Sequence, residues 1–573
     1  MNRPPGCPPR IEDSRESRHF RRVRVALVLA ALALGGEEPA FALDRIDTDV
    51  CVYGGTAAGV ASAIQASRMG KSIVLIEPGL HVGGMTSGGL GATDIGNKAA
   101  IGGIAREFYQ RIARHYAQPS AWHLETAEEY FSKRRGGQTA ASSLSGTDAS
   151  MWTFEPKVAE NILFAMLNEA RVPVYLGQRL SRVRKSGVRI AAIHCESGRV
   201  FRGRQFIDCT YEGDLTAQAG VSYFVGREGN ERYGETLNGV RAETPQHQFA
   251  VGVDPYVTPG DAGSRRLAFI QAGDGGTPGS EDHRLQAYNF RLCFTTNPVN
   301  RAAVEAPKSY RPEDYELLAR YLETLVAAGK KPALSQFWHP IWMPNHKTDI
   351  NNNGGFSTDF IGMNYEYPEA GYPARSRIWH DHEDYTRGFI HFLSTSPRVP
   401  ENIRAEMQQW GMAKDEFLDT GGWPHQLYVR EARRVIGAYV MTEHNCRGTI
   451  VAGDAVGLAA YNMDSHNCQR IVQDGVARNE GDVQAPVQPY PISYRSLIPK
   501  ADECENLLVP VCLSATHIAY GSIRMEPVFM ILGQSAATAA CIAIDDEVPV
   551  QEVEYQTLRT RLLSDRQVLE WNP

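Results

Sequence analysis

The stretch that decides the fold is TDVCVYGGTAAGVASAIQASRMGKSIVLIEP, residues 48–78. Its pattern predicts a short buried strand at Val50–Tyr53, a glycine turn, a small-residue helix at Ala57–Met69 and a second strand at Ser72–Ile76. This layout is typical of dinucleotide binding, because the turn and the helix N-terminus bring backbone N–H groups to a diphosphate. Glu77 closes the second strand, where an acidic residue binds ribose hydroxyls.

The turn departs from the G-x-G-x-x-G fingerprint at one position. Thr56 stands where the second glycine is expected, and a β-branched side chain there limits how closely a diphosphate can approach. The flanking strand, the helix and Glu77 nevertheless favour a nucleotide site over an ordinary strand–helix turn. The predicted cofactor contacts in this unit are Gly54, Gly55, Thr56, Ala57, Ala58, Gly59, Glu77 and Pro78.

A second glycine-rich run, His81–Gly91, follows directly and indicates which nucleotide is bound. NAD domains do not need such a run, whereas the chain of a large flavoprotein must pass along the extended FAD. Here the sequence resembles the FAD-dependent oxidoreductases of the glutathione-reductase-like superfamily. It is most similar to a family of secreted bacterial FAD oxidoreductases, often labelled xanthan lyases, whose turn reads GGT-x-AG followed by GGM-T-x-GG. The resemblance implies that Thr56 is a family feature and that FAD contacts Gly83, Gly84, Met85 and Thr86.

Two later segments carry the same resemblance. Residues 208–215, DCTYEGDL, resemble the family's second FAD segment, DATYEGDL. Asp214 could equally serve as the acid at a helix N-terminus. The C-terminal flavin segment falls within residues 505–544, where Cys512 takes the position of an acid in many relatives. The further FAD contacts implied are Asp208, Cys209, Thr210, Asp214, Cys512 and Gln534.

We therefore expect an α/β fold, with a Rossmann-like, glutathione-reductase-like FAD-binding domain and an inserted α+β cap domain over the substrate. The FAD-binding domain is expected to be discontinuous, from residues 43–222 and 440–573. Residues 223–439 have a different composition, rich in Trp, Tyr, His, Asn and Pro, and are expected to form the cap.

Residues 1–42 have the pattern of an export signal. Residues 10–24 are basic, residues 25–34 are apolar but too short to span a bilayer, and Ala40-Phe41-Ala42 is a small-x-small cleavage site. Residues 20–25 contain a loose twin-arginine pattern, a route that suits a flavoprotein loaded before export. We expect cleavage after Ala42, a periplasmic or secreted protein and no stable membrane insertion afterwards. A retained membrane anchor is the alternative.

Charge and cysteine content exclude several classes. Removal of residues 1–42 takes away seven Arg and five acidic residues and changes the net charge from −7 to −9, which argues against a nucleic-acid partner. Nine cysteines follow Cys7 without any C-x-x-C pair, so we expect no metal site. A Cys446–Cys468 disulfide stays open, and the odd count leaves at least one thiol free.

A hydroxyl-bearing substrate would lose a hydride to flavin N5 and a proton to a base, which is usually histidine near neutral pH. His517 is the first candidate and His466 the second, while Arg524 and Tyr520 could hold a carbonyl oxygen, a carboxylate or the flavin O2. The resemblance assigns residues 454–466 to the substrate side. In the cap, the aromatic run at 337–342 and the polar loop at 347–355 suggest a sugar or polyol pocket.

The predicted function is thus an exported FAD-dependent oxidoreductase that transfers hydride from a hydroxyl-bearing, sugar- or polyol-like small molecule. One alternative is a flavin-dependent reductase or desaturase that binds an unsaturated or carboxylate substrate through the Arg cluster at 430–434. The other is a non-redox carbohydrate lyase or binding protein. The electron acceptor stays open among dioxygen, a quinone and a soluble carrier, and no second nucleotide fingerprint indicates NAD(P)H.

Overall fold

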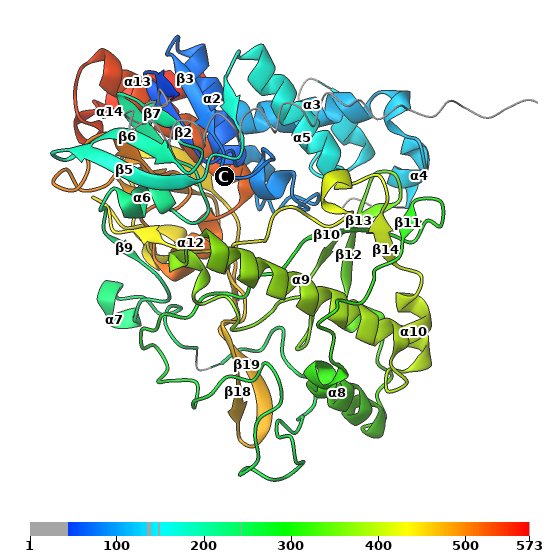
Figure 1. Cartoon of the computed structure of the whole chain (residues 1–573). Coiled ribbons are helices and arrows are strands. Elements are labelled where there is room, and N and C mark those ends of the chain that lie inside the picture. Colours follow the sequence, from blue (N-terminus) through cyan, green and yellow to red (C-terminus); the bar gives the residue numbers. More distant parts are fainter. Residues whose placement is uncertain (1–43, 134–138, 147–148, 242, 572–573) are drawn as a thin grey trace, which may run out of the picture. The chain divides into compact units, whose positions relative to one another are not determined.

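The computed structural model describes residues 44–133, 139–146, 149–241 and 243–571, and from Ile46 onward the chain forms one compact unit. The predicted strand–turn–helix–strand unit is present as β2 (Val50–Tyr53), α2 (Ala57–Arg68) and β3 (Ile73–Ile76) (Figure 1). The export signal predicted for residues 1–42 lies outside the described residues.

β2 and β3 belong to a five-stranded parallel sheet with the order β22-β8-β2-β3-β4. Val50 and Val52 pack in the main core, whereas Cys51 and Tyr53 pack in a second core on the opposite face. Side chains alternate along a strand, so both faces are covered, as a continuous apolar run predicts. The other strands are β4 (Val174–Tyr175), β8 (Gln205–Asp208) and β22 (Leu507–Leu508).

Helices cover one face of this sheet. α13 (Glu526–Asp545) packs along α2, and a Cβ at Gly533 would lie 2.2 Å from the carbonyl oxygen of Ala58, so the two backbones approach closely. Among the described helices, α13 is long and apolar enough to cross a membrane, yet its apolar window is wholly buried inside the fold. The outer helices are α3 (Gly103–Tyr116), α5 (Pro156–Glu169) and α14 (Tyr555–Ser564).

The other face is covered by a four-stranded sheet with the order β1-β7-β6-β5. Its strands pack Leu180, Ile193 and Phe201 against the side chains of Cys51 and Tyr53. They are β1 (Arg45–Asp47), β5 (Leu180–Ser186), β6 (Arg189–Cys195) and β7 (Val200–Arg202). Because β2, β3 and β8 run parallel, their carboxyl ends meet at one edge of the sheet, where open α/β sheets bind ligands.

The predicted cap contains a five-stranded antiparallel sheet with the order β11-β14-β10-β13-β12, with helices beside it (Figure 1). Its strands are β10 (Leu292–Thr295), β11 (Arg301–Ala302), β12 (His339–Met343), β13 (Lys347–Asn351) and β14 (Gly411–Ala413). Its helices are α8 (Glu316–Ala327), α9 (Tyr372–Thr395) and α10 (Glu401–Met407).

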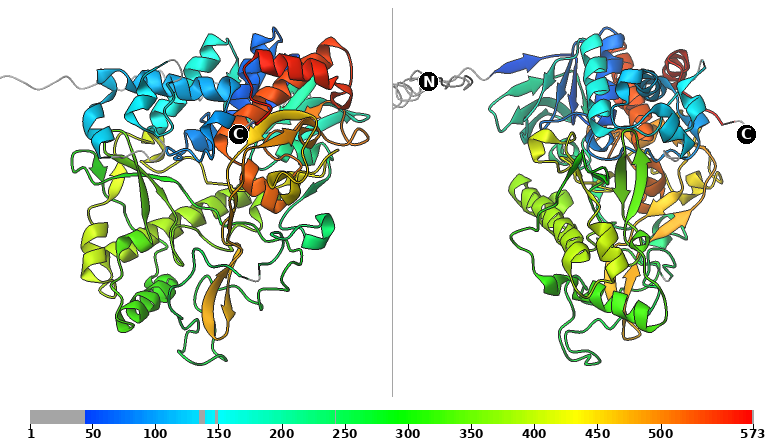
Figure 2. Two further views of the ribbon diagram at one scale, coloured as in Figure 1. Left: turned by 180° about the vertical axis from the view of Figure 1, so that it is seen from behind. Right: turned by 90° about the vertical axis from the view of Figure 1, so that its right-hand side faces the viewer.

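Three antiparallel strand pairs, nested one within another, follow the predicted cap, and the innermost pair is a hairpin. The pairs are β16 (Ala455–Ala459) with β21 (Tyr490–Ser493), β17 (Met463–Ser465) with β20 (Val483–Ala485), and β18 (Gln469–Gln473) with β19 (Val476–Glu480). The β18–β19 hairpin lies among cap segments in every view (Figures 1 and 2). Ala477 N donates to Val253 O at 2.9 Å, and Gln271 N donates to Arg470 O at 2.8 Å. These bonds join the hairpin to residues of the predicted cap, across the predicted domain boundary at residue 440.

Short elements complete the described chain. The stretch 118–150, predicted as surface loop, contains α4, whose Thr126 and Glu129 form a capping box. The nine described cysteines are all free and buried, so Cys446 and Cys468 are not bonded to each other. The short elements are α4 (Ala127–Ser132), α6 (Asp214–Gln218), α7 (Asn230–Tyr233), α11 (Glu443–Cys446), α12 (His517–Ile523), β9 (Tyr223–Phe224) and β15 (Arg434–Val435).

Candidate functional site

The turn between β2 and α2 is shaped by its glycines. Gly54 has a φ of 101°, and a Cβ there would lie 2.6 Å from Thr210 N. A Cβ at Gly59 would lie 1.8 Å from Gly54 O. Neither position admits a side chain, so the turn packs directly against the second predicted FAD segment.

Thr56 occupies the third fingerprint position for a structural reason. Its hydroxyl donates to Cys209 O at 2.8 Å and accepts from Gly59 N at 3.4 Å, so it caps α2. The N–H groups of Ala57 and Ala58 lie in the first turn, where a helix offers its backbone donors to an anion. Thr56 thus fixes the helix N-terminus instead of obstructing it.

Glu77 stands at the end of β3, as predicted. One carboxylate oxygen accepts from Gly55 N at 2.5 Å, and the other accepts from Gly79 N. Burial raises the pKa of this carboxyl to about 7, against the backbone donors that lower it. The carboxylate therefore faces the turn from the position expected for a ribose ligand.

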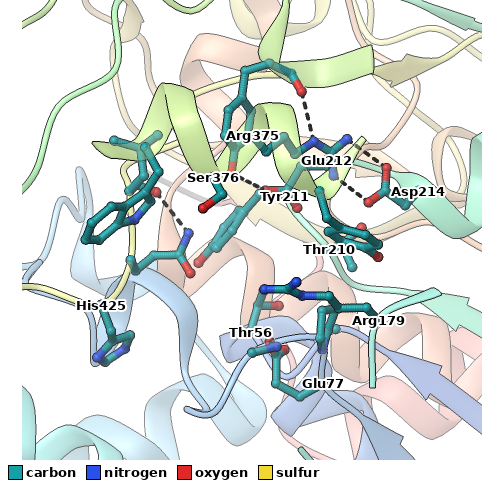
Figure 3. Close-up of a pocket in the computed structure, with 18 residues that line it drawn as sticks. Thr56, Glu77, Arg179, Thr210, Tyr211, Glu212, Asp214, Arg375, Ser376 and His425 are labelled. Atoms are coloured by element: carbon teal, nitrogen blue, oxygen red, sulfur yellow. Dashed lines mark hydrogen bonds and ion pairs between the residues drawn. The ribbon is translucent and has the colours of Figure 1, made fainter. Parts of the chain in front are cut away.

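A cavity of about 290 Å³ opens between the turn, the second FAD segment and α9 (Figure 3). We call it the cofactor cavity, because six predicted cofactor residues line it: Gly54, Thr56, Glu77, Pro78, Thr210 and Asp214. Its other lining residues are Gly79, Arg179, Tyr211, Glu212, Tyr367, Tyr372, Arg375, Ser376, Trp379, His425, Gln426 and Leu427. Sequence motifs singled out none of these twelve as cofactor contacts, since most come from α9 and from the end of the cap.

Among these lining residues, His425 stands out because its ring nitrogens lack hydrogen-bond partners. Its ring stacks on His81 with centroids 3.9 Å apart, and neither of its nitrogens has a partner among the described residues. Burial, followed by the neighbouring His81, lowers its pKa to about 3. A neutral imidazole therefore faces the cofactor cavity, and nothing in the motif Trp423-Pro424-His425 predicted it.

The second glycine run lies behind the cavity wall. A Cβ at Gly84 would lie 2.2 Å from the Tyr211 hydroxyl, which accepts from Met85 N at 2.8 Å. Thr86 and Tyr211 both donate to the carboxylate of Glu526, at 2.8 and 2.7 Å. Gly83, Gly84, Met85 and Thr86 do not line the cavity, but they fasten Tyr211, which does.

The second FAD segment is held mainly by its own acids. Asp208 accepts from the N–H and hydroxyl groups of Thr210 and Thr216, and Cys209 Sγ lies 3.6 Å from Ser62 Oγ. Asp208 and Cys209 therefore support the segment from beneath. Asp214 pairs with Arg375 of α9 at 2.6 and 2.8 Å (Figure 3).

Cys512 and Gln534, also predicted as cofactor residues, lie outside the cavity as well. The Cys512 thiol donates to the carbonyl oxygens of Thr210 and Tyr211, beneath the second segment. Gln534 accepts from Ile104 N at 2.8 Å and lines a separate groove beside Gln65. The helical period of α13 turns position 534 towards α2 and α3, so its side chain does not reach the cofactor cavity.

Residues of the predicted substrate segments line a second cavity, of about 220 Å³. We call it the polar pocket. The loop at 351–353 and residues 461–466 meet there, although they lie on opposite sides of the predicted boundary. Its lining residues are Asp94, His247, Arg291, His339, Asn351, Asn352, Asn353, Tyr428, Tyr461, Asn462, Asp464, His466 and Gln484.

His466 faces the polar pocket. Its Nδ1 lies 2.8 Å from Asp359 Oδ2, and its Nε2 lies 3.6 Å from Asp464 Oδ2, too far for a hydrogen bond. Burial and Arg430 oppose a charge on the ring, but Asp359 and Asp464 outweigh them and raise its pKa. Nε2 is thus the nitrogen left for a ligand.

The other predicted catalytic residues divide between the pocket and the core. Arg524 does not line the pocket, but it donates to two residues that do, Asp464 at 2.7 Å and the Tyr428 hydroxyl at 2.9 Å. His517 is 2% exposed, and its ring nitrogens are bound to Glu431 and Ser465. Tyr520 is 1% exposed in the same buried helix, α12. His517 and Tyr520 line neither cavity.

The two cavities share a wall. His425, Gln426 and Leu427 line the cofactor cavity, and the next residue, Tyr428, lines the polar pocket. A Cβ at Gly88 would lie 2.4 Å from Gln426 Cβ, so the second glycine run packs against this wall. Consecutive residues of one chain segment, 425–428, thus line both cavities.

The arginines of the predicted cluster and those at or beside the polar pocket are already paired. None of these five offers an unpaired guanidinium to an anion. The ion pairs are Arg430–Asp359, Arg433–Asp214, Arg434–Glu228, Arg291–Asp349 and Arg524–Asp464, at 2.7 to 3.0 Å.

One group among the described residues has the ligand spacing of a metal site: His123, Glu155 and Asp415. Lys347 donates to both carboxylates at 2.6 Å, and Lys157 also binds Asp415. Lysine ammonium groups therefore already supply the positive charge that a cation would bring.

Comparison with protein families gives one match. A family model described as FAD dependent oxidoreductase matches residues 49–562. A comparison with curated proteins found no match.

Solved structures give only partial matches. A 3-ketosteroid-Δ4-(5α)-dehydrogenase from Rhodococcus jostii RHA1 is 16% identical, with a TM-score of 0.18, over 30% of this chain and 47% of its own. A flavin-containing monooxygenase from Stenotrophomonas maltophilia is 17% identical, with a TM-score of 0.18, over 34% and 45%. An L-amino acid deaminase from Proteus vulgaris is 14% identical, with a TM-score of 0.22, over 34% and 55%. The matched region thus spans about half of each solved chain.

Proposed function

Because the chain belongs to the family of FAD-dependent oxidoreductases, we propose that it oxidises a hydroxyl group of a neutral, polyhydroxylated small molecule such as a sugar or polyol. The cofactor is FAD, and the chain is an oxidoreductase. The family match favours this redox chemistry over the lyase or binding-protein alternative.

The residues of the cofactor cavity fit FAD. The glycines at 54 and 59 leave room for a close backbone approach, and the first turn of α2 offers N–H donors to a diphosphate. Glu77 offers carboxylate oxygens to ribose hydroxyls. FAD, when bound, accepts a hydride at flavin N5.

The charge balance of the polar pocket is the observation that supports a neutral substrate. The arginines at or beside it are paired with aspartates, and Asp94 adds a further acid to the lining. A carboxylate substrate would meet these acids without a free guanidinium to bind, which disfavours the reductase or desaturase alternative.

Hydroxyl groups suit the same lining. Asn351, Asn352 and Asn353 offer amide donors and acceptors, and Tyr428 and Tyr461 add phenol groups. His466 Nδ1 donates to Asp359, and in the protonated ring, which the raised pKa favours, Nε2 can also donate to a substrate oxygen.

Anaerobic mixing of the FAD-loaded protein with aldoses, polyols and hydroxy acids tests the proposal, with flavin absorbance as the readout. A neutral polyol should bleach the flavin, and Asn352→Ala should raise the concentration needed for half-maximal bleaching. If only an unsaturated acid reoxidises the reduced enzyme and no polyol bleaches it, the proposal is wrong.

We also propose that the protein is exported to the periplasm or beyond and that residues 1–42 are removed. The basic, apolar and small-x-small pattern of that segment supports this. Cell fractionation of the wild type and of a double variant, Arg21→Lys with Arg22→Lys, tests it. The variant should stay in the cytoplasm if the twin-arginine pattern directs export.

A further inference from the structure

The polar pocket holds a second imidazole, His247. Its backbone φ of 47° lies in the left-handed region, which residues other than glycine rarely adopt. Its carbonyl oxygen accepts hydrogen bonds from Asn467 Nδ2 at 3.2 Å and Asn479 Nδ2 at 2.9 Å. A strained backbone held by buried amides beside a cavity is a feature that functional sites share.

The His247 ring is arranged as a partner of His466. The two rings are nearly parallel, with an interplanar angle of 16° and centroids 6.2 Å apart, and both line the polar pocket. Within the described chain, His247 Nδ1 has no hydrogen-bond partner, whereas His466 Nδ1 is tied to Asp359. The two imidazoles therefore offer a ligand different groups.

The surrounding charges move the pKa values of the two rings apart. Burial lowers the pKa of His247, and His466 lowers it further, against Asp359 and Asp464. The same two aspartates also raise the pKa of His466, and there they prevail over burial and Arg430, so that its pKa is raised. Asp482, whose pKa burial raises to about 7, is the remaining acid at the pair. When two neighbouring titratable groups have pKa values moved apart in this way, one can act as the acid and the other as the base.

We propose that His247 is the base that takes the hydroxyl proton of the substrate, while His466 donates a hydrogen bond to the same oxygen. The inference rests on the proposed function. The C–H bond breaks and its hydride passes to FAD, the O–H proton moves to a ring nitrogen of His247, and a C=O bond forms. His466 stays protonated and neutralises the negative charge that develops on the oxygen.

The test is stopped-flow flavin bleaching under anaerobic conditions, from about pH 5 to 9, with whichever aldose or polyol bleaches the wild type. In the wild type, the rate should rise with pH through the low pKa of His247 and fall through the higher pKa of His466. His247→Asn should slow bleaching about a hundredfold or more and remove the acidic limb. Asparagine tolerates the left-handed backbone at this position.

The controls separate catalysis from folding. His466→Gln should remove the alkaline limb instead of the acidic one. His194, on β6, also has a buried nitrogen without a partner in the described chain and a pKa lowered by burial, but it lines neither cavity. His194→Gln should therefore leave the profile unchanged. FAD absorbance and melting temperature should match the wild type in all variants.

The outcomes distinguish this inference from the function on which it rests. If the wild type is bleached and His247→Asn keeps the same rate and acidic limb, His247 is not the base, while polyol oxidation stands. If no neutral polyol bleaches the wild type, the proposed function fails, and the assignment of the base fails with it.

Discussion

At the scale of single residues, Thr56 turns an apparent defect of the fingerprint into a helix cap. Its hydroxyl holds both the α2 N-terminus and Cys209 O. Thr56→Ala should lower the free energy of unfolding by about 1 kcal/mol, because a capping oxygen is lost. Thr56→Ser keeps that oxygen and should cost much less. Urea unfolding of the ligand-free protein measures both, and equal losses would contradict the capping role.

Glu77 should make FAD binding depend on pH. The pKa of its carboxyl is raised to about 7, and the deprotonated form is the better acceptor for ribose hydroxyls. FAD affinity should therefore fall as the pH drops below about 7 and level off above it. Glu77→Gln should remove this dependence and weaken binding about tenfold or more. Fluorescence titration with FAD measures both effects, with the exposed Glu196→Gln as the control.

At the scale of elements, the Asp214–Arg375 pair joins the second FAD segment to α9. Arg375→Met would leave a largely buried carboxylate with Arg433 as its remaining partner. We expect a loss of about 3 kcal/mol in the free energy of unfolding. Asp214→Asn in the same protein should recover part of that loss, because the largely buried carboxylate that lost Arg375 is then uncharged. A strictly additive double-mutant cycle would show that the pair is not coupled.

The helices and strands also show which parts of the fold could be predicted from the sequence. The unit from Val50 to Ile76 was predictable because period, turn and helix end are all local signals. Gln534 was misplaced because a motif does not give the rotation of a buried helix. His247 was missed because its partner, His466, is 219 positions away, and only the folded chain brings them together.

At the scale of the whole molecule, one ligand should hold segments from distant parts of the chain. The cofactor cavity is lined by residues from the β2–α2 turn, the second FAD segment, α9 and the cap's end. FAD at a hundred times its Kd should add about 2.7 kcal/mol of stability and raise the melting temperature of a chain of this size by about 2–3 °C. ADP should also stabilise the protein, through the diphosphate and ribose groups. FMN, which lacks adenosine, should raise the melting temperature less than ADP, and the reverse order would place the adenosine elsewhere.

Labelling of the nine buried thiols can report where the fold opens locally. They are distributed over separate parts, with Cys51 in the parallel sheet, Cys293 in the cap sheet and Cys541 in α13. A thiol reagent can reach each one only when its surroundings open. In protein without residues 1–42, which also lacks Cys7, the order of labelling would therefore record which layer loosens first, without any engineered probe.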